Sequence, residues 1–416
     1  MSIRDMMGCR LACSTLLLLI QLLWNLLPGQ PEAALSASLG VDNLVFEGIE
    51  TNYAGDYDKA LNLFQQVETL APDHPAGAFY QASVLFWKNS LDPNNPRYDD
   101  DIRRLLERAI AVSQKRLDKQ ADDLDALHYM GLAYTYLGRM DAHRGRLYEG
   151  GVQGETGRKY LETAMQLYRN SASGNAGKNE NAALVYEDIH FPYGAYVYFA
   201  GRLPRFLRMF NFLWFIPRGS APEGIAALEK ARKNSRLHHL GATHLLVSIY
   251  AHLEPGKTRE ALALSTELTR RFPDNPVLDL QQARLLLLNG KYEEARAHTR
   301  SILNKVRTAR LNYDAWVLNA TRLIIAEIDI HKGELQASTA ALADIESSAK
   351  PEIAAVLSPQ ILLLKGMIED LKGLRREAVR YYKAVLDQED RFRNRMAEKE
   401  AQRRIEQAFS PGLPRG

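Results

Sequence analysis

Hydrophobic residues recur at helical spacing along most of the chain, in paired stretches that are joined by short turns. In residues 41–74, two such stretches meet at Gly55-Asp56, and Pro72 closes the second. Apolar positions three and four residues apart indicate amphipathic helices, and proline cannot continue a helix. Sustained alternation of period two and clusters of β-branched residues are both missing from the sequence, so no sheet is expected. The pattern therefore predicts an all-α protein built from helix hairpins.

Small and large residues in residues 41–74 have the spacing that close packing of two helices needs. Gly48 and Ala60 let the paired helices approach, and Phe64 fills the gap between neighbours. These positions resemble the tetratricopeptide repeat (TPR), a unit of about 34 residues. The other residues that match this family are Gly55, Tyr57 and Pro72.

The resemblance recurs along the chain. The clearest further copies contain Ala283, Gly290, Tyr292, Ala295 and Ile302, and then Gly366, Gly373, Ala378, Tyr382 and Val385. With weaker copies between them, about seven or eight units are expected. Gly290 and Gly333 are 43 residues apart, and Gly333 and Gly373 are 40 apart, so some helices must be longer than usual. The resemblance implies a right-handed TPR-like α-solenoid over residues 38–416, irregular and with insertions.

Three segments have loop-like compositions. Lys88–Asp100 is rich in Asn, Pro and Asp, and Met140–Gly157 contains five glycines, so both are predicted to be insertions, the second a flexible one. Ser171–Asn181 is a third predicted loop. Residues 391–410 are predicted to form a C-terminal capping helix, because an end repeat needs one solvated side.

The N-terminus has the features of a signal peptide. Arg4 and Arg10 precede an apolar run over residues 11–27, and small residues surround Ser36 and Ala37. We expect residues 1–37 to be removed on export, with an uncleaved membrane anchor as the alternative. The two cysteines of the chain, Cys9 and Cys13, lie in this segment. The mature chain would hold no thiol, which favours a bacterial periplasm and excludes thiol catalysis, disulfides and thiolate metal sites.

Charge and motifs argue against several function classes. Lysine and arginine number 53 against 50 aspartates and glutamates, a net charge of +3 that is too balanced for a nucleic-acid partner. His238, His239 and His244 lack the four-residue spacing of a helical metal site, and the glycine run at residues 150–157 lacks the end of a phosphate loop. We therefore expect no catalytic, cofactor or metal residues, and no enzyme.

Residues 185–235 are predicted to form an irregular, aromatic-rich unit. Within it, Phe206–Ile216 is interrupted only by Arg208 and Asn211. Such a run either packs inside the protein or lies at a membrane interface through Phe206, Phe210 and Trp214. Residues 194–228 also resemble a segment of the TPR family that includes the yeast inclusion-body clearance protein, a likeness that implies fold and not function.

Stacked helix hairpins curve, and the first helix of each hairpin faces the concave side, where TPR proteins bind peptides or helices. By the TPR resemblance, this groove would present Asn52, Tyr53, His128, Tyr136, Arg284 and Met367. The predicted function is an exported, non-enzymatic scaffold or adaptor of the cell envelope that binds a protein or peptide. A membrane-interface or lipid-associated protein that uses residues 206–216 is the alternative. The oligomeric state is left open.

Overall fold

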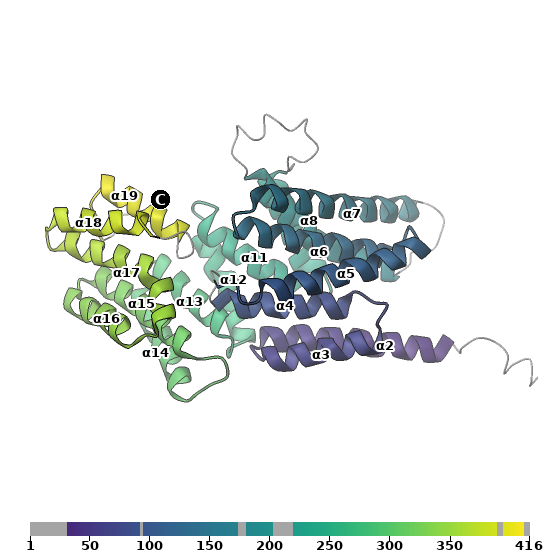
Figure 1. The fold of residues 1–416 in the computed structure, drawn as a ribbon, viewed down its shortest axis with the longest axis horizontal. Helices are drawn as coiled ribbons and strands as arrows, with labels where there is room; N and C mark the ends of the chain where they lie inside the picture. The colour runs from purple at the N-terminus through teal and green to yellow at the C-terminus, as the bar shows by residue number, and fades with distance from the viewer. Residues whose placement is uncertain (1–30, 92–94, 174–179, 203–218, 389–393, 412–416) are drawn as a thin grey trace, which may run out of the picture.

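The computed structural model describes residues 31–91, 95–173, 180–202, 219–388 and 394–411, and this part of the chain consists of helices joined by short turns, without a strand. Successive helices pack side by side as antiparallel hairpins (Figure 1). The first helices of the hairpins are α2 (Pro31–Tyr53), α4 (Ala76–Leu91), α6 (Leu124–His143), α8 (Glu180–Gly201), α11 (His239–His252), α13 (Pro276–Leu288), α15 (Ala315–Lys332) and α17 (Pro351–Leu371). The second helices are α3 (Tyr57–Leu70), α5 (Asp99–Lys119), α7 (Leu147–Ser173), α10 (Ala221–Asn234), α12 (Thr258–Arg271), α14 (Tyr292–Arg307), α16 (Leu335–Ser348) and α18 (Arg375–Leu386). The predicted all-α solenoid of helix hairpins is confirmed, and α19 (Arg395–Glu406) follows the last hairpin.

The hairpins form where the sequence places small and large residues opposite each other. A side chain at Gly48 would lie 2.5 Å from the ring of Phe64, and one at Gly366 would lie 2.4 Å from the ring of Tyr382. Each glycine therefore lets the second helix seat an aromatic ring against the first. Gly373 turns the chain between α17 and α18 with a φ of +78°, a conformation that other residues rarely adopt.

The prediction of a flexible insertion at Met140–Gly157 is wrong. Helix α6 runs to His143, and α7 begins at Leu147 after a turn at Gly145. Gly150, Gly154 and Gly157 lie inside α7, where they bring its backbone against that of α6. These glycines are spaced four and three residues apart, so they share one helix face. A side chain at Gly150 or Gly157 would meet the backbone of α6, and one at Gly154 would meet the ring of Tyr196 on α8. The role of these glycines is therefore close helix packing.

The other predicted interruptions are shorter than expected. Helix α4 continues to Leu91 and α5 starts at Asp99, so both ends of Lys88–Asp100 are helical. Helix α7 continues to Ser173, and α8 starts at Glu180. Of the aromatic-rich unit at residues 185–235, the structure describes α8 and α10, which pack on each other through Gly194 and Gly224. Residues 203–218 lie outside the described part of the chain.

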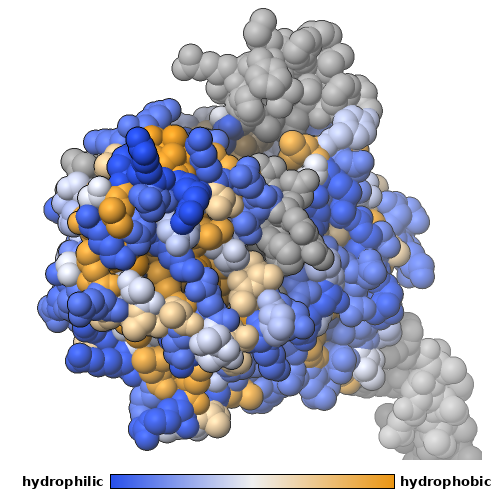
Figure 2. Space-filling model, turned by 60° about the vertical axis from the view of Figure 1, so that its left-hand side comes forward, coloured by the Kyte–Doolittle hydropathy of each residue, from blue (hydrophilic) through white to orange (hydrophobic). Residues whose placement is uncertain are grey.

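Two large hydrophobic cores fill the solenoid. The N-terminal core collects buried side chains from α2 to α13, and the C-terminal core collects those of α15 to α19. A smaller cluster around Ala283, Ile302 and Val317 joins the two. Helix α17 is the one helix among the described residues that is long and apolar enough to cross a membrane, and Leu364, Met367 and Ile368 of α17 are buried in the C-terminal core. Figure 2 shows hydrophobic residues scattered among hydrophilic ones on the side of the molecule that carries the C-terminal helices.

Candidate partner-binding site

The first hairpin meets the turn between α12 and α13, so the solenoid closes on itself. Nδ2 of Asn275 donates a hydrogen bond to the carbonyl of Tyr53 at 2.9 Å, and Arg271 forms an ion pair with Glu50 at 2.6 Å. Nδ2 of Asn312 donates to the carbonyl of Gly55 at 2.5 Å. These contacts join segments that are more than 200 residues apart in the sequence. The concave side of the N-terminal helices therefore encloses an interior instead of an open groove.

Aromatic rings from successive first helices fill this interior. Tyr53 of α2 meets Trp87 of α4 edge-on, with ring centroids 4.7 Å apart. Trp87 in turn lies 4.7 Å from His244 of α11, and Phe191 of α8 stacks on His238 at 5.2 Å. Offset and edge-on ring pairs of this kind stabilise a core beyond the area that they bury. Helix α11 thus occupies the space that a bound segment would take in an open solenoid.

A small cavity remains at the centre of the interior. Its volume is about 50 Å³, which is room for a few water molecules. Residues of α2, α3, α4, α6 and α8 line it, together with Leu237, His238 and Gly241. Asn52 lines the cavity, and its Oδ1 has no hydrogen-bond partner among the described residues. The cavity is too small for a peptide side chain of any length, so it is not a partner site.

Three histidines lie where α11 closes the interior, His128 and His238 buried and His244 half-buried. Burial lowers the pKa of His128 to about 4, with a further contribution from His238. Burial also lowers the pKa of His238 to about 3 and that of His244 to about 4, where Arg139 adds to the effect. The Nε2 atoms of His128 and His238 lie 3.2 Å apart, so one neutral ring donates to the other. The described residues hold no group of His, Cys, Asp or Glu side chains that could bind a metal ion.

The structure places four of the six predicted groove residues inside the protein. Asn52, Tyr53 and His128 lie in the N-terminal interior, and Met367 lies in the C-terminal core, each with less than a tenth of its surface exposed. This placement corrects the expectation of an open groove at these positions. For Asn52, Tyr53 and His128 the physical reason is the closure by α11, whereas Met367 on α17 is covered by the neighbouring C-terminal helices. Tyr136 and Arg284 are half-buried and remain accessible.

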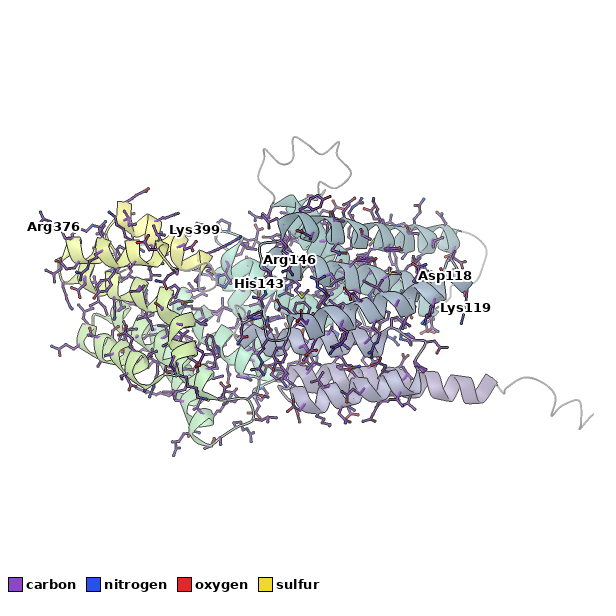
Figure 3. All side chains as sticks on the ribbon, viewed as in Figure 1. Asp118, Lys119, His143, Arg146, Arg376 and Lys399 are labelled. Carbon is purple, nitrogen blue, oxygen red and sulfur yellow. The ribbon has the colours of Figure 1, made fainter. Side chains whose placement is uncertain are left out.

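Tyr136 and Arg284 belong to a strip of accessible residues that we call the inner strip: Phe86, Tyr136, Arg139, His244, Ser248 and Arg284. The ring of Tyr136 lies 5.1 Å from that of Phe86, and the guanidinium of Arg139 lies 5.7 Å from the same Phe86 ring. The strip continues from α6 and α4 onto α11 and α13. Figure 3 labels His143, the last residue of α6, and Arg146 in the turn that follows, near the middle of the molecule.

Contacts along α11 and α13 connect the two ends of the inner strip. Arg139 influences the pKa of His244, and Ser248 lies one helical turn beyond that histidine. Nε2 of Gln281 donates to Oγ of Ser248 at 3.5 Å, and Arg284 lies one turn further along α13. Arg284 forms an ion pair with the buried carboxylate of Glu327 on α15. Sequence reasoning missed Phe86, Arg139, His244 and Ser248; the position of Arg139, three residues after Tyr136 on the same helix face, was the available signal.

The predicted membrane-contact residues Phe206, Phe210 and Trp214 lie outside the described residues, as does most of the predicted signal peptide. Phe199 of α8 is 46% exposed and Leu253 at the end of α11 is 41% exposed. Arg202, between them, pairs with Glu254 and donates to the carbonyl of Leu253 at 2.9 Å. This end of α8 is therefore held by polar contacts to α11.

Comparisons with known proteins give one family match and several distant structural matches. A family model described as tetratricopeptide repeat matches residues 252–313, which span α12, α13 and α14. Solved structures that the chain matches at low similarity include yeast Tom70 (12% identity, TM-score 0.35, covering 86% of this chain and 88% of that one) and a human IFIT1 dimer with PPP-AAAA (14%, 0.35, 89% and 86%). The TPR domain of P58(IPK) is a third (15%, 0.22, 89% and 99%). No curated protein sequence matches the chain.

The residues matched by the family model include a hairpin in which the glycine, the small residue and the bulky residue of the repeat occupy their expected places. Gly290 turns the chain with a φ of +71°, and Ala295 and Ile302 are fully buried between α13 and α15. The same arrangement of glycine, small residue and bulky residue recurs around Gly48 and Phe64, and around Gly366 and Tyr382. Residues 252–313 thus match the tetratricopeptide-repeat family, and hairpins elsewhere in the chain repeat the same arrangement.

Proposed function

We propose that this chain is an exported, non-enzymatic scaffold that binds a protein partner along the inner strip. Tetratricopeptide repeats generally serve as protein-interaction scaffolds, because stacked hairpins form an extended concave surface that suits binding. The observation that carries the proposal is the inner strip itself. Its residues lie on α4, α6, α11 and α13, and ring, charge and hydrogen-bond contacts link these four helices.

The composition of the inner strip suits a protein partner. It combines two aromatic side chains, Phe86 and Tyr136, with the arginines Arg139 and Arg284. Tyrosine and arginine are enriched among residues that dominate binding energy at protein interfaces. Arg139 is exposed on α6, so its charge is available to a carboxylate of the partner. We expect the partner to present an apolar or helical segment with an acidic residue opposite Arg139.

Buried charged groups of the chain support a structural and not a chemical role. Asp279 accepts hydrogen bonds from Lys305 at 2.6 Å and Tyr313 at 2.5 Å, and Asp370 pairs with Arg375 at 2.9 Å. Asp141 pairs in the same way with Arg103 and Arg146. Each pair joins one helix to the next or closes a turn. Carboxylates that are held this way stabilise the stack and are not free for acid–base chemistry.

The export half of the proposal rests on residues 1–37 alone. A basic start, an apolar run and small residues near Ser36 and Ala37 favour secretion and cleavage, with delivery to a bacterial periplasm. An uncleaved helix would instead tether the scaffold to a membrane. Intact-mass measurement of the protein purified from its own host distinguishes the two, because cleavage removes about 37 residues from the chain.

Binding through the inner strip is tested by capture of a partner with matched variants. The tagged chain is cross-linked in its own host, purified, and the partner is identified by mass spectrometry. Arg139→Glu should abolish its recovery, because reversal of an exposed charge breaks attraction without disturbing packing. The double variant Arg284→Gln with Glu327→Gln should weaken recovery too, since it removes the strip charge and leaves no unpaired carboxylate.

Arg300→Glu is the matched control, because Arg300 is exposed on α14, away from the strip. Its recovery of the partner should equal that of the unchanged chain. Equal recovery with Arg139→Glu and Arg300→Glu would refute the role of the strip. Recovery of lipid without any protein would instead favour the membrane-interface function through Phe206, Phe210 and Trp214, which Phe210→Ser should then abolish in vesicle flotation.

A further inference from the structure

We propose that the end of the described chain, residues 407–411, occupies a peptide-binding site of its own protein, and that a partner segment with a phenylalanine can displace it. This site lies at the ends of α15 and α17, away from the inner strip. The proposal goes beyond the scaffold function, since it names a second site, the chemistry of its ligand and its control.

Residues 407–411 have the exposure pattern of a bound peptide. Helix α19 ends at Glu406, and the chain then continues without helical structure. Of the five residues that follow, Phe409 is buried, with 5% of its surface exposed, and the other four are exposed. One buried aromatic anchor between exposed neighbours is how short extended segments bind to protein grooves.

The contacts of Phe409 use both its backbone and its ring. Its N–H donates a hydrogen bond to Oδ2 of Asp370 at 2.8 Å. The ring meets His331 of α15 edge-on, with centroids 5.5 Å apart, and the guanidinium of Arg404 lies 4.9 Å from the ring centroid. A charged acceptor for the main chain, an aromatic wall and a cation over the ring together define a seat for phenylalanine. We call it the Phe409 seat.

The Phe409 seat is built without help from residues 407–411. Asp370 is held by Nη1 of Arg375 at 2.9 Å and by the hydroxyl of Tyr382 at 2.8 Å. His331 stacks on Tyr292, with ring centroids 5.3 Å apart. Arg375 also fixes the end of α19 by donating to the carbonyls of Arg404 and Ile405, at 2.7 and 2.8 Å. All these contacts remain when Phe409 leaves, so the seat is ready for another ligand.

The free energy of docking residues 407–411 is a small difference between favourable and unfavourable terms. One buried aromatic ring and one charge-assisted hydrogen bond favour docking, while the ordering of five residues opposes it. Covalent attachment favours docking by giving the segment an effective concentration of about 1 mM at the seat. A free peptide of the same chemistry must compete with this concentration. The attached segment therefore raises the concentration of partner that is needed to fill the seat.

The test uses a labelled synthetic peptide with the sequence of residues 405–411 and the whole chain. Phe409→Ala in the protein empties the seat and leaves its walls, and we expect the peptide to bind this variant at least about tenfold more tightly than the unchanged chain. His331→Ala added to that variant should reverse the gain. A peptide with alanine in place of phenylalanine is the control and should bind neither protein. Equal binding to the unchanged and Phe409→Ala chains, with both folded by circular dichroism, would overturn the proposal.

A second measurement needs no variant protein. In the unchanged chain, the amide of Phe409 is protected by its hydrogen bond to Asp370. Excess peptide should displace the attached segment and accelerate hydrogen exchange at residues 407–411, while the alanine control peptide should leave exchange unchanged. No acceleration by the phenylalanine peptide at concentrations well above 1 mM, about the effective concentration of the attached segment, would refute displacement. Arg139→Glu on α6 changes no residue of this seat, so failure of either proposal leaves the other standing.

Discussion

Substitution of Gly138 by alanine tests the close packing of α6 on α7. A methyl group at Gly138 would lie 2.8 Å from the carbonyl oxygen of Gly150, and 2.9 Å from the backbone nitrogen of Gly154. Both neighbours are backbone atoms of α7, so no change of rotamer can relieve the contact. Overpacking of this kind costs about 3 kcal/mol, at the upper end of its usual range. Alanine regains about 1 kcal/mol through its higher helix propensity, which leaves a net loss of about 2 kcal/mol.

The same substitution at Gly40 is the matched control. Gly40 lies in α2 with nothing within 4 Å of the added methyl group, so Gly40→Ala should stabilise the protein by about 1 kcal/mol. The free energy of unfolding of both variants is measured by urea denaturation, followed by far-ultraviolet circular dichroism. The two shifts should have opposite signs. If Gly138→Ala were as stable as the unchanged chain, α6 and α7 would not pack backbone to backbone, and Met140–Gly157 would be the flexible insertion that its glycine content suggests.

Two further predictions concern buried ionisable groups. His128, His238 and His244 are held neutral with pKa values of about 4, 3 and 4, below the value of about 6.5 in an unfolded chain. The unfolded state therefore binds more protons between these limits, so stability falls as the pH drops below about 6.5, and His244→Phe should reduce that dependence in urea midpoints measured across this range. Asp279→Ala removes a buried carboxylate from Lys305, His298 and Tyr313, and should lower the free energy of unfolding by about 3 kcal/mol. Asp344→Ala breaks an exposed ion pair with Arg322 and should lower it by less than about 1 kcal/mol. Similar losses in thermal or urea unfolding for these two aspartate variants would contradict the assigned contacts.

The helix hairpins could be predicted from the sequence because their signals are local. Gly48 and Phe64, or Gly366 and Tyr382, are 16 residues apart and meet within one hairpin. Turn glycines such as Gly373 mark the joints directly, since their positive φ excludes most other residues. Both residues of each pair, and the turn between them, lie within one repeat, so a short stretch of sequence is enough to predict the hairpin.

The closure of the solenoid could not be predicted in this way. It depends on small rotations between successive hairpins, which accumulate until Tyr53 meets Phe272 and Asn275. The total rotation depends on all the hairpins together and cannot be inferred from the sequence of one repeat. Asn52 and His128 therefore looked like groove residues from their positions, although the helices that bury them lie more than 100 residues later.

The number of glycines in residues 140–157 suggests a loop, but their spacing indicates a helix. Gly150, Gly154 and Gly157 fall on one helix face, opposite Gly131 and Gly138 of α6. The spacing of four and three residues was present in the sequence and is typical of close helix contact. Glycines at irregular spacing would still have indicated a loop.

Closure of the solenoid, which hides the N-terminal concave side and leaves the inner strip, is tested most directly by a zero-length cross-link. Arg271 and Glu50 form an ion pair at 2.6 Å, and both side chains are accessible to reagent. In the variant Arg271→Lys, carbodiimide should join the lysine at position 271 to Glu50 within a monomer, and the added change Glu50→Gln should abolish this product. Lys59 and Glu47, 3.0 Å apart in the first hairpin, provide a positive control in the same sample. A product between Lys59 and Glu47 without one between positions 271 and 50 would contradict closure and restore an open groove.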